Sequence, residues 1–145
     1  AVGYTGLSEK EAIAEGYDVE VLHNIKPSRA DYLGGKELVI KAIADRKTSR
    51  ILGVQIVGQD GVDKRLDVFV TAISFKAKAE DLFHLDLAYA PTFSTTKDPV
   101  MYTGIRVSQV MQLKTYYEIW ALKKYLIFLV GIRIIRVLKR ENKKH

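Results

Sequence analysis

Cysteine is absent from all 145 residues of the chain. The sequence therefore excludes disulfides, thiolate nucleophiles and zinc–thiolate sites. The absence fits a reducing compartment, and we expect the cytoplasm. Histidine is also scarce: His23, His84 and His145 lie far apart, with no helical His pair, so we expect no metal site.

Phosphate-binding and membrane-spanning signals are missing as well. No glycine spacing matches a phosphate loop or a dinucleotide fingerprint, and no serine occupies a nucleophile elbow. The apolar run from Tyr125 to Ile132 has eight residues, whereas a bilayer requires about 20. The chain begins at Ala1 without a signal-like segment, and we expect this start to lie within a longer protein.

Positive charge is concentrated at one end. Residues 1–100 contain 13 Lys/Arg and 15 Asp/Glu, whereas residues 101–145 contain 10 and 2, and together they carry the formal net charge of +6. The basic character belongs to the C-terminal part, so we expect no nucleic-acid partner for the rest.

Local patterns predict an N-terminal helix followed by strands. Ser8 and Glu11 have the spacing of a capping box, which predicts a short helix that stops near Gly16. Alternation around Val19 and Val21 predicts a half-buried strand.

The middle of the chain has the pattern of a hairpin. Two apolar runs, residues 38–44 and 51–57, flank a polar connector at residues 45–50. Gly53 in the second run indicates either close approach by another element or a bulge.

The apolar period then lengthens to three and four, which predicts a helix over residues 61–75 and a shorter one near residues 80–83. The apolar positions of the helix over residues 61–75 are Val62, Leu66, Phe69, Val70 and Ile73. We therefore expect an α+β domain whose antiparallel sheet has three to five strands, with helices on one side.

One longer motif carries most of the functional information. The run from Leu85 to Thr95, Leu-Asp-Leu-Ala-Tyr-Ala-Pro-Thr-Phe-Ser-Thr, is followed by Lys-Asp-Pro-Val at residues 97–100. With residues 5–12, 51–58 and 64–68, it resembles the C-terminal dimerisation domain of FAD-dependent pyridine nucleotide-disulfide reductases. The branch it resembles most is that of coenzyme A-disulfide reductase and related NAD(P)H oxidases. The resemblance covers residues 1–104 and ends there.

The resemblance excludes one mechanism and points to another. Family members with a paired-cysteine centre have His-Pro-Thr-x-x-Glu in this loop. In this chain Ala90 replaces the His and Thr95 replaces the Glu. The loop of this chain therefore lacks that acid–base pair. The coenzyme A branch has Tyr-Ala-Pro, which Tyr89 matches. Its second tyrosine lies in a loop that Tyr32, before Leu33 and Gly34, matches less closely. The resemblance implies that both phenols act across the interface on the partner subunit's redox cysteine. The alternative is that they are interface aromatics.

The implied enzyme is a homodimer that uses FAD and NAD(P)H, with coenzyme A disulfide or a related small thiol substrate at the interface. The FAD domain, the NAD(P) domain and the redox cysteine lie outside this chain, so it is not catalytic alone. The sequence does not decide among four substrates: coenzyme A disulfide, polysulfide, peroxide and oxygen. It does not decide the preference for NADH or NADPH either. The alternative function is a stand-alone, non-catalytic dimerising or partner-binding protein.

Residues 105–145 form a divergent, basic and apolar tail for which we expect a helix. Arg133, Arg136, Arg140 and Lys143 recur at three-to-four spacing, which suits a membrane-surface helix. We favour instead a helix that packs or binds a partner. A third interpretation is a reading frame or domain boundary lost near Gly104.

Overall fold

The computed structural model describes the backbone of residues 1–141 and the side chains of residues 1–129. The chain divides into two compact units, Ala1–Met111 and Gln112–His145. The expected boundary after residue 104 falls inside one continuous helix, α4 (Pro99–Glu141). That boundary stays a prediction.

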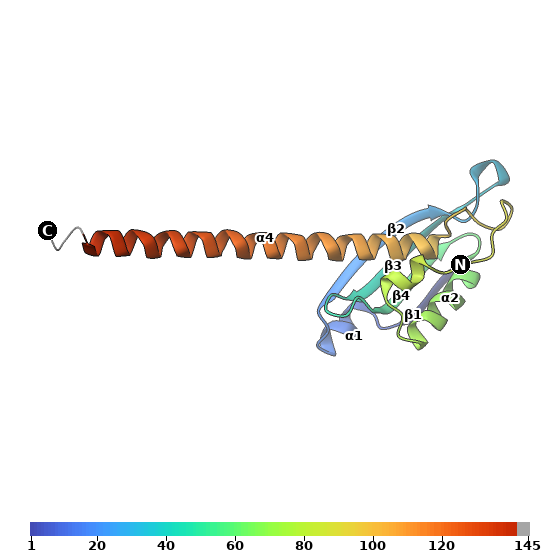
Figure 1. Ribbon diagram of the computed structural model, residues 1–145. Coiled ribbons are helices and arrows are strands. Elements are labelled where there is room, and N and C mark those ends of the chain that lie inside the picture. The colour runs from blue at the N-terminus through green and yellow to red at the C-terminus, as the bar shows by residue number, and fades with distance from the viewer. Residues whose placement is uncertain (142–145) are drawn as a thin grey trace. The chain divides into compact units, whose positions relative to one another are not determined.

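The first unit is built on a four-stranded antiparallel sheet (Figure 1). Its strands are β1 (Val2–Gly6), β2 (Val19–Pro27), β3 (Glu37–Asp45) and β4 (Ile51–Gly58), in the order β1-β4-β3-β2. Strands β3 and β4 form the predicted hairpin around residues 45–50, and β2 pairs along the whole of β3. Strand β1 was not predicted, because its five residues are too few to establish a period.

Helices α2 (Val62–Ser74), α3 (Ala79–Phe83) and the start of α4 cover one face of the sheet. Alternate residues of β3 meet them in a single core, whose members include Leu38, Ile40, Ala42, Phe69, Leu82, Val100 and Val107. The short helix α1 (Glu9–Ala14) packs in a separate cluster with Ile43 and Leu52. The expected α+β fold, with helices on one side of an antiparallel sheet, is confirmed.

Helix α2 is rotated slightly from its predicted orientation. Phe69 is completely buried, as expected, but Val70 is 41% exposed. A charged residue, Arg65, takes a place in the buried stripe. Apolar periodicity assigns arginine to the solvent face, and it fails here because a buried carboxylate neutralises Arg65.

The predicted capping box forms as expected. The Ser8 hydroxyl accepts a hydrogen bond from the Glu11 amide, and the Glu11 carboxylate accepts one from the Ser8 amide at 2.8 Å. These bonds from Ser8 to the carboxylate hold the pKa of Glu11 below its ordinary value of 4.5.

We expect the capping carboxylate to make folding stability depend on pH. A lowered folded-state pKa stabilises the fold above the unfolded pKa, and this contribution disappears as pH falls through the folded value. The stability lead of the wild type over Glu11→Gln should therefore be largest near pH 7 and shrink below pH 4.5. Urea unfolding from pH 3 to 7 measures it. Glu15→Gln, which lies at the other end of α1, is the control; equal pH profiles for both variants would contradict the expectation.

The second unit, described by itself, is the continuation of α4 as far as Glu141. The basic residues Arg133, Arg136, Arg140 and Lys143, together with the end of the apolar run, lie outside the described side chains. Within the described part of the chain, no helix is both long and apolar enough to cross a membrane.

Candidate functional site

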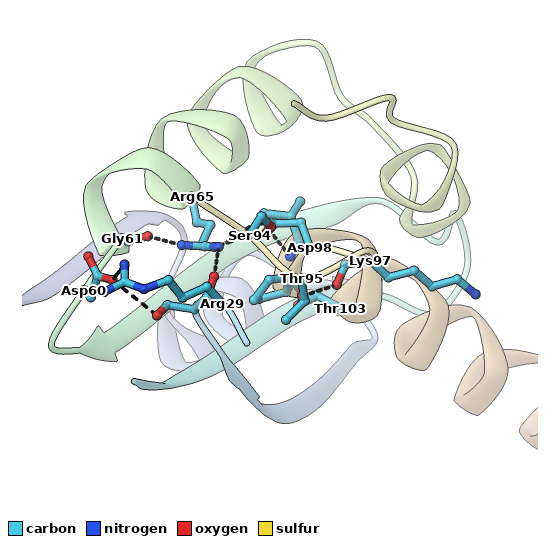
Figure 2. Close-up of polar contacts among 12 residues, drawn as sticks. Arg29, Asp60, Gly61, Arg65, Ser94, Thr95, Lys97, Asp98 and Thr103 are labelled. Carbon is cyan, nitrogen blue, oxygen red and sulfur yellow. Dashed lines mark hydrogen bonds and ion pairs between the residues drawn. The ribbon is translucent and has the colours of Figure 1, made fainter. Parts of the chain in front are cut away.

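Arg65 joins three loops at one edge of the first unit (Figure 2). Its side chain is almost fully buried, and one guanidinium nitrogen donates to the Ser28 carbonyl at 2.9 Å. Another donates to the Gly61 carbonyl at 3.0 Å. The remaining contacts are to Asp98, at 2.9 and 3.3 Å. The guanidinium thus ties the β2–β3 loop, the turn into α2 and the start of α4 together.

Asp98 is the acceptor at the centre of this network. Besides Arg65, its carboxylate accepts from the Ser94 hydroxyl at 2.7 Å and from the Val100 amide at 3.0 Å. The bond from Val100 caps the N-terminus of α4, and Pro99 takes the first helical position, where a missing amide has no cost. Asp98 therefore fixes the end of the loop that carries Tyr89.

A second ion pair lies outside the first. Arg29 binds the Asp60 carboxylate, which also accepts from the Ser28 hydroxyl. The Arg29 side chain also donates to the Leu33 carbonyl at 2.9 Å, across the short 3-10 turn Asp31–Leu33. The bond from Arg29 to Leu33 thereby holds the two sides of the loop that presents Tyr32 together.

The structure places Tyr89 at a cavity of about 330 Å³ next to this network. Lys64 brings positive charge to the cavity, and Arg29 lines it together with its ion-pair partner Asp60. Thr92 and Phe93 line it from the same loop as Tyr89. The Tyr89 side chain is 54% exposed, and its hydroxyl has no hydrogen-bond partner among the described residues. Tyr32 is 81% exposed and does not line this cavity.

This arrangement offers hydrogen bonds and positive charge, without an acid–base pair. Thr95, where paired-cysteine enzymes have Glu, donates its hydroxyl to the Lys97 carbonyl, and Ala90 has no titratable group. Among the described residues there is no cluster of three potential metal ligands.

The described residues do not fit a dinucleotide cofactor. Gly34 and Gly35 precede a strand rather than a helix. The turn into α2 has Gly58 and Gly61 but lacks the three-glycine fingerprint, and the sheet is antiparallel.

Arg65 and Asp98 were not identified from the sequence. The Asp-Pro pair before α4 was a usable signal, because it is typical of a capped helix start. Nothing local marks Arg65, whose partner lies 33 residues away.

Comparisons with known proteins agree with the fold and the motif. Residues 1–99 match the model of the pyridine nucleotide-disulphide oxidoreductase dimerisation domain. The chain is 41% identical over 101 residues to the NAD(P)H coenzyme A polysulfide/persulfide reductase of Pyrococcus horikoshii, covering 69% of the chain and 22% of that protein. It is 42% identical over 103 residues to the coenzyme A-dependent NAD(P)H sulfur oxidoreductase of Pyrococcus furiosus, covering 69% of the chain and 23% of that protein.

A solved structure matches in the same region. The reduced CoADR-RHD protein of Bacillus anthracis superimposes with a TM-score of 0.74 at 39% identity, over 77% of this chain and 20% of that one. The chain thus spans less than a quarter of the length of each of these relatives. On this evidence, the chain belongs to the dimerisation-domain family of the pyridine nucleotide-disulphide oxidoreductases.

Proposed function

We propose that this domain forms the two-fold interface of an NAD(P)H-dependent, FAD-containing reductase that acts on coenzyme A disulfide or persulfide. Both Pyrococcus relatives are described as NAD(P)H enzymes that involve coenzyme A. A homodimer is the expected assembly, because an isologous contact places the same loop at two equivalent sites.

The observation that carries the proposal is the environment of Tyr89. Its hydroxyl is unpartnered among the described residues and lies beside the cavity that Arg29 and Lys64 line. Coenzyme A carries phosphates, which basic side chains bind well. The buried Arg65–Asp98 ion pair holds the end of the loop that carries Tyr89, and this anchoring supports the position of the phenol.

In this proposal the Tyr89 phenol donates a hydrogen bond to a sulfur at the partner subunit's redox cysteine. A phenol hydroxyl carries one hydrogen-bond donor, and donation to a thiolate stabilises the thiolate. Tyr32 is proposed for the same role from the loop that Arg29 holds, and it lies outside the cavity.

An apolar groove offers a surface for the second subunit. Phe75, at the end of α2, is 83% exposed and lines this groove together with Val68, Leu85 and Leu87. Contact with a second copy would remove this apolar surface from water. Phe69 takes no part, because it is buried against its own sheet.

We expect Tyr89→Phe in the full-length enzyme to slow turnover of coenzyme A disulfide by about 10- to 100-fold, the value of one hydrogen bond to a charged group. NAD(P)H oxidation with an artificial dye acceptor should be unchanged, because it bypasses the sulfur chemistry. Steady-state kinetics with both acceptors measure the two effects.

Tyr4→Phe is the control, since Tyr4 is an exposed tyrosine on strand β1, away from the cavity. Tyr32→Phe, assayed in parallel, tests the second phenol. Disulfide turnover that is unchanged in Tyr89→Phe would make Tyr89 an interface aromatic and remove its proposed role.

A further inference from the structure

The second unit exposes an unusual amount of apolar surface. All of its large apolar side chains that the structure describes are between 44% and 73% exposed. They are Leu113, Tyr116, Tyr117, Ile119, Trp120, Leu122, Tyr125, Leu126, Ile127, Phe128 and Leu129. Single exposed apolar residues are ordinary, but a contiguous set of this size marks an interaction surface.

These side chains surround the helix. Leu113, Trp120 and Ile127 recur every seven residues along one side, whereas Leu122 and Leu129 lie on the opposite side. The same stretch also contains Lys114, Glu118, Lys123 and Lys124, so charged side chains are interleaved with the apolar ones along the helix.

The charges favour an anionic surface. Residues 112–145 contain nine Lys/Arg and two Asp/Glu. The Lys124 ammonium lies 4.8 Å from the centre of the Trp120 ring, so basic and aromatic groups are interleaved. A second copy of the same segment would bring like charges together, whereas anionic lipid supplies both opposite charge and apolar depth.

The residue types also suit the boundary of a bilayer. Tyr116, Tyr117, Trp120 and Tyr125 combine an apolar ring with a polar group, as side chains at membrane–water interfaces do. Lys123 and Lys124 have long apolar stems that can extend toward headgroups while their neighbours insert. No helix among the described residues is suited to crossing a membrane.

We propose that residues 113–129 bind the surface of an anionic lipid membrane, with their aromatic and aliphatic side chains inserted and the lysines at the headgroups. The proposal is independent of the one for Tyr89, because it rests on a different unit of the chain.

The single tryptophan of the chain makes a direct test available. Trp120 is 53% exposed, so its emission reports on this segment alone. With vesicles of phosphatidylcholine and phosphatidylglycerol, the emission of the intact chain should shift to shorter wavelength. Vesicles of phosphatidylcholine alone should have a much smaller effect, and added salt should weaken the response.

Charge reversal provides the second arm. The double variant Lys123→Glu/Lys124→Glu should lower the partition coefficient onto anionic vesicles by about 30-fold or more, from the contribution of each basic residue near the surface. Tyr4→Glu is the control, because it places a new charge at an exposed aromatic position in the first unit, and it should leave partitioning unchanged. The salt dependence of the wild type tests the electrostatic part without any substitution.

Five results would overturn the proposal. Three concern lipid: an unchanged emission with anionic vesicles, an equal shift with phosphatidylcholine alone, and a lysine double variant that partitions like the wild type. A shift without lipid that grows with protein concentration would assign the surface to a second copy of the chain. A shift produced by single-stranded RNA in place of vesicles would assign it to nucleic acid.

Discussion

Replacement of Asp98 by alanine is expected to lower the free energy of unfolding by about 3–5 kcal/mol, the usual cost of breaking a buried ion pair. The side chains of Asp98 and Arg65 are 3% and 2% exposed. Without the carboxylate, the Arg65 guanidinium would stay buried with only carbonyl acceptors. The cap of α4 and the anchor of Ser94 would be lost with it.

Urea unfolding followed by circular dichroism measures the effect, and an exposed ion pair supplies the control. Asp18 binds Arg46 at 3.1 Å with both side chains at least 40% exposed, so Asp18→Ala should cost at most about 1 kcal/mol. A loss for Asp98→Ala no larger than the loss for Asp18→Ala would refute the assigned role.

A double variant separates charge from capping. Arg65→Met/Asp98→Asn removes both charges while the asparagine side chain retains an acceptor for the Val100 amide. We expect it to be more stable than Asp98→Ala, because no uncompensated charge stays buried. If the double variant were the less stable of the two, desolvation of Arg65 would not be the dominant cost.

Substitution of Gly53 by alanine is expected to cost about 3 kcal/mol, at the upper end of typical overpacking penalties. A Cβ at this position would lie 1.9 Å from the Leu7 carbonyl oxygen and 2.8 Å from the Leu7 carbonyl carbon. These are backbone atoms, and the Leu7 amide is itself bonded to the Leu52 carbonyl at 2.9 Å. Relief therefore requires the chain between β1 and α1 to move.

Gly34→Ala distinguishes steric contact from backbone conformation. Gly34 has a φ of +75°, but nothing lies within 4 Å of its added Cβ, so alanine there should cost about 1–2 kcal/mol from conformation alone. Urea denaturation compares the two variants. If Gly53→Ala cost no more than Gly34→Ala, the approach of Leu7 would not be what restricts position 53 to glycine.

Position 53 shows where inference from sequence ends. A glycine inside a strand pattern indicated either a close approach or a bulge, and both features are found nearby. Leu7 lies against Gly53, and the pairing register shifts between Ile43 and Ala44 on the adjacent strand. The two explanations could be separated only once a segment 46 residues earlier was placed beside β4.

The sequence by itself determined the features that depend on near neighbours. The Ser8–Glu11 capping box, the β3–β4 hairpin and helix α2 all follow from contacts within a few residues or from a regular apolar period. The motif around Tyr89 was long enough to identify the family. Tertiary structure alone decided the burial of Arg65 against Asp98 and the grouping of Tyr89 with Arg29 and Lys64 at one cavity. The physical reason is that the cost of burying a charge depends on a partner that only the folded chain brings within hydrogen-bonding distance.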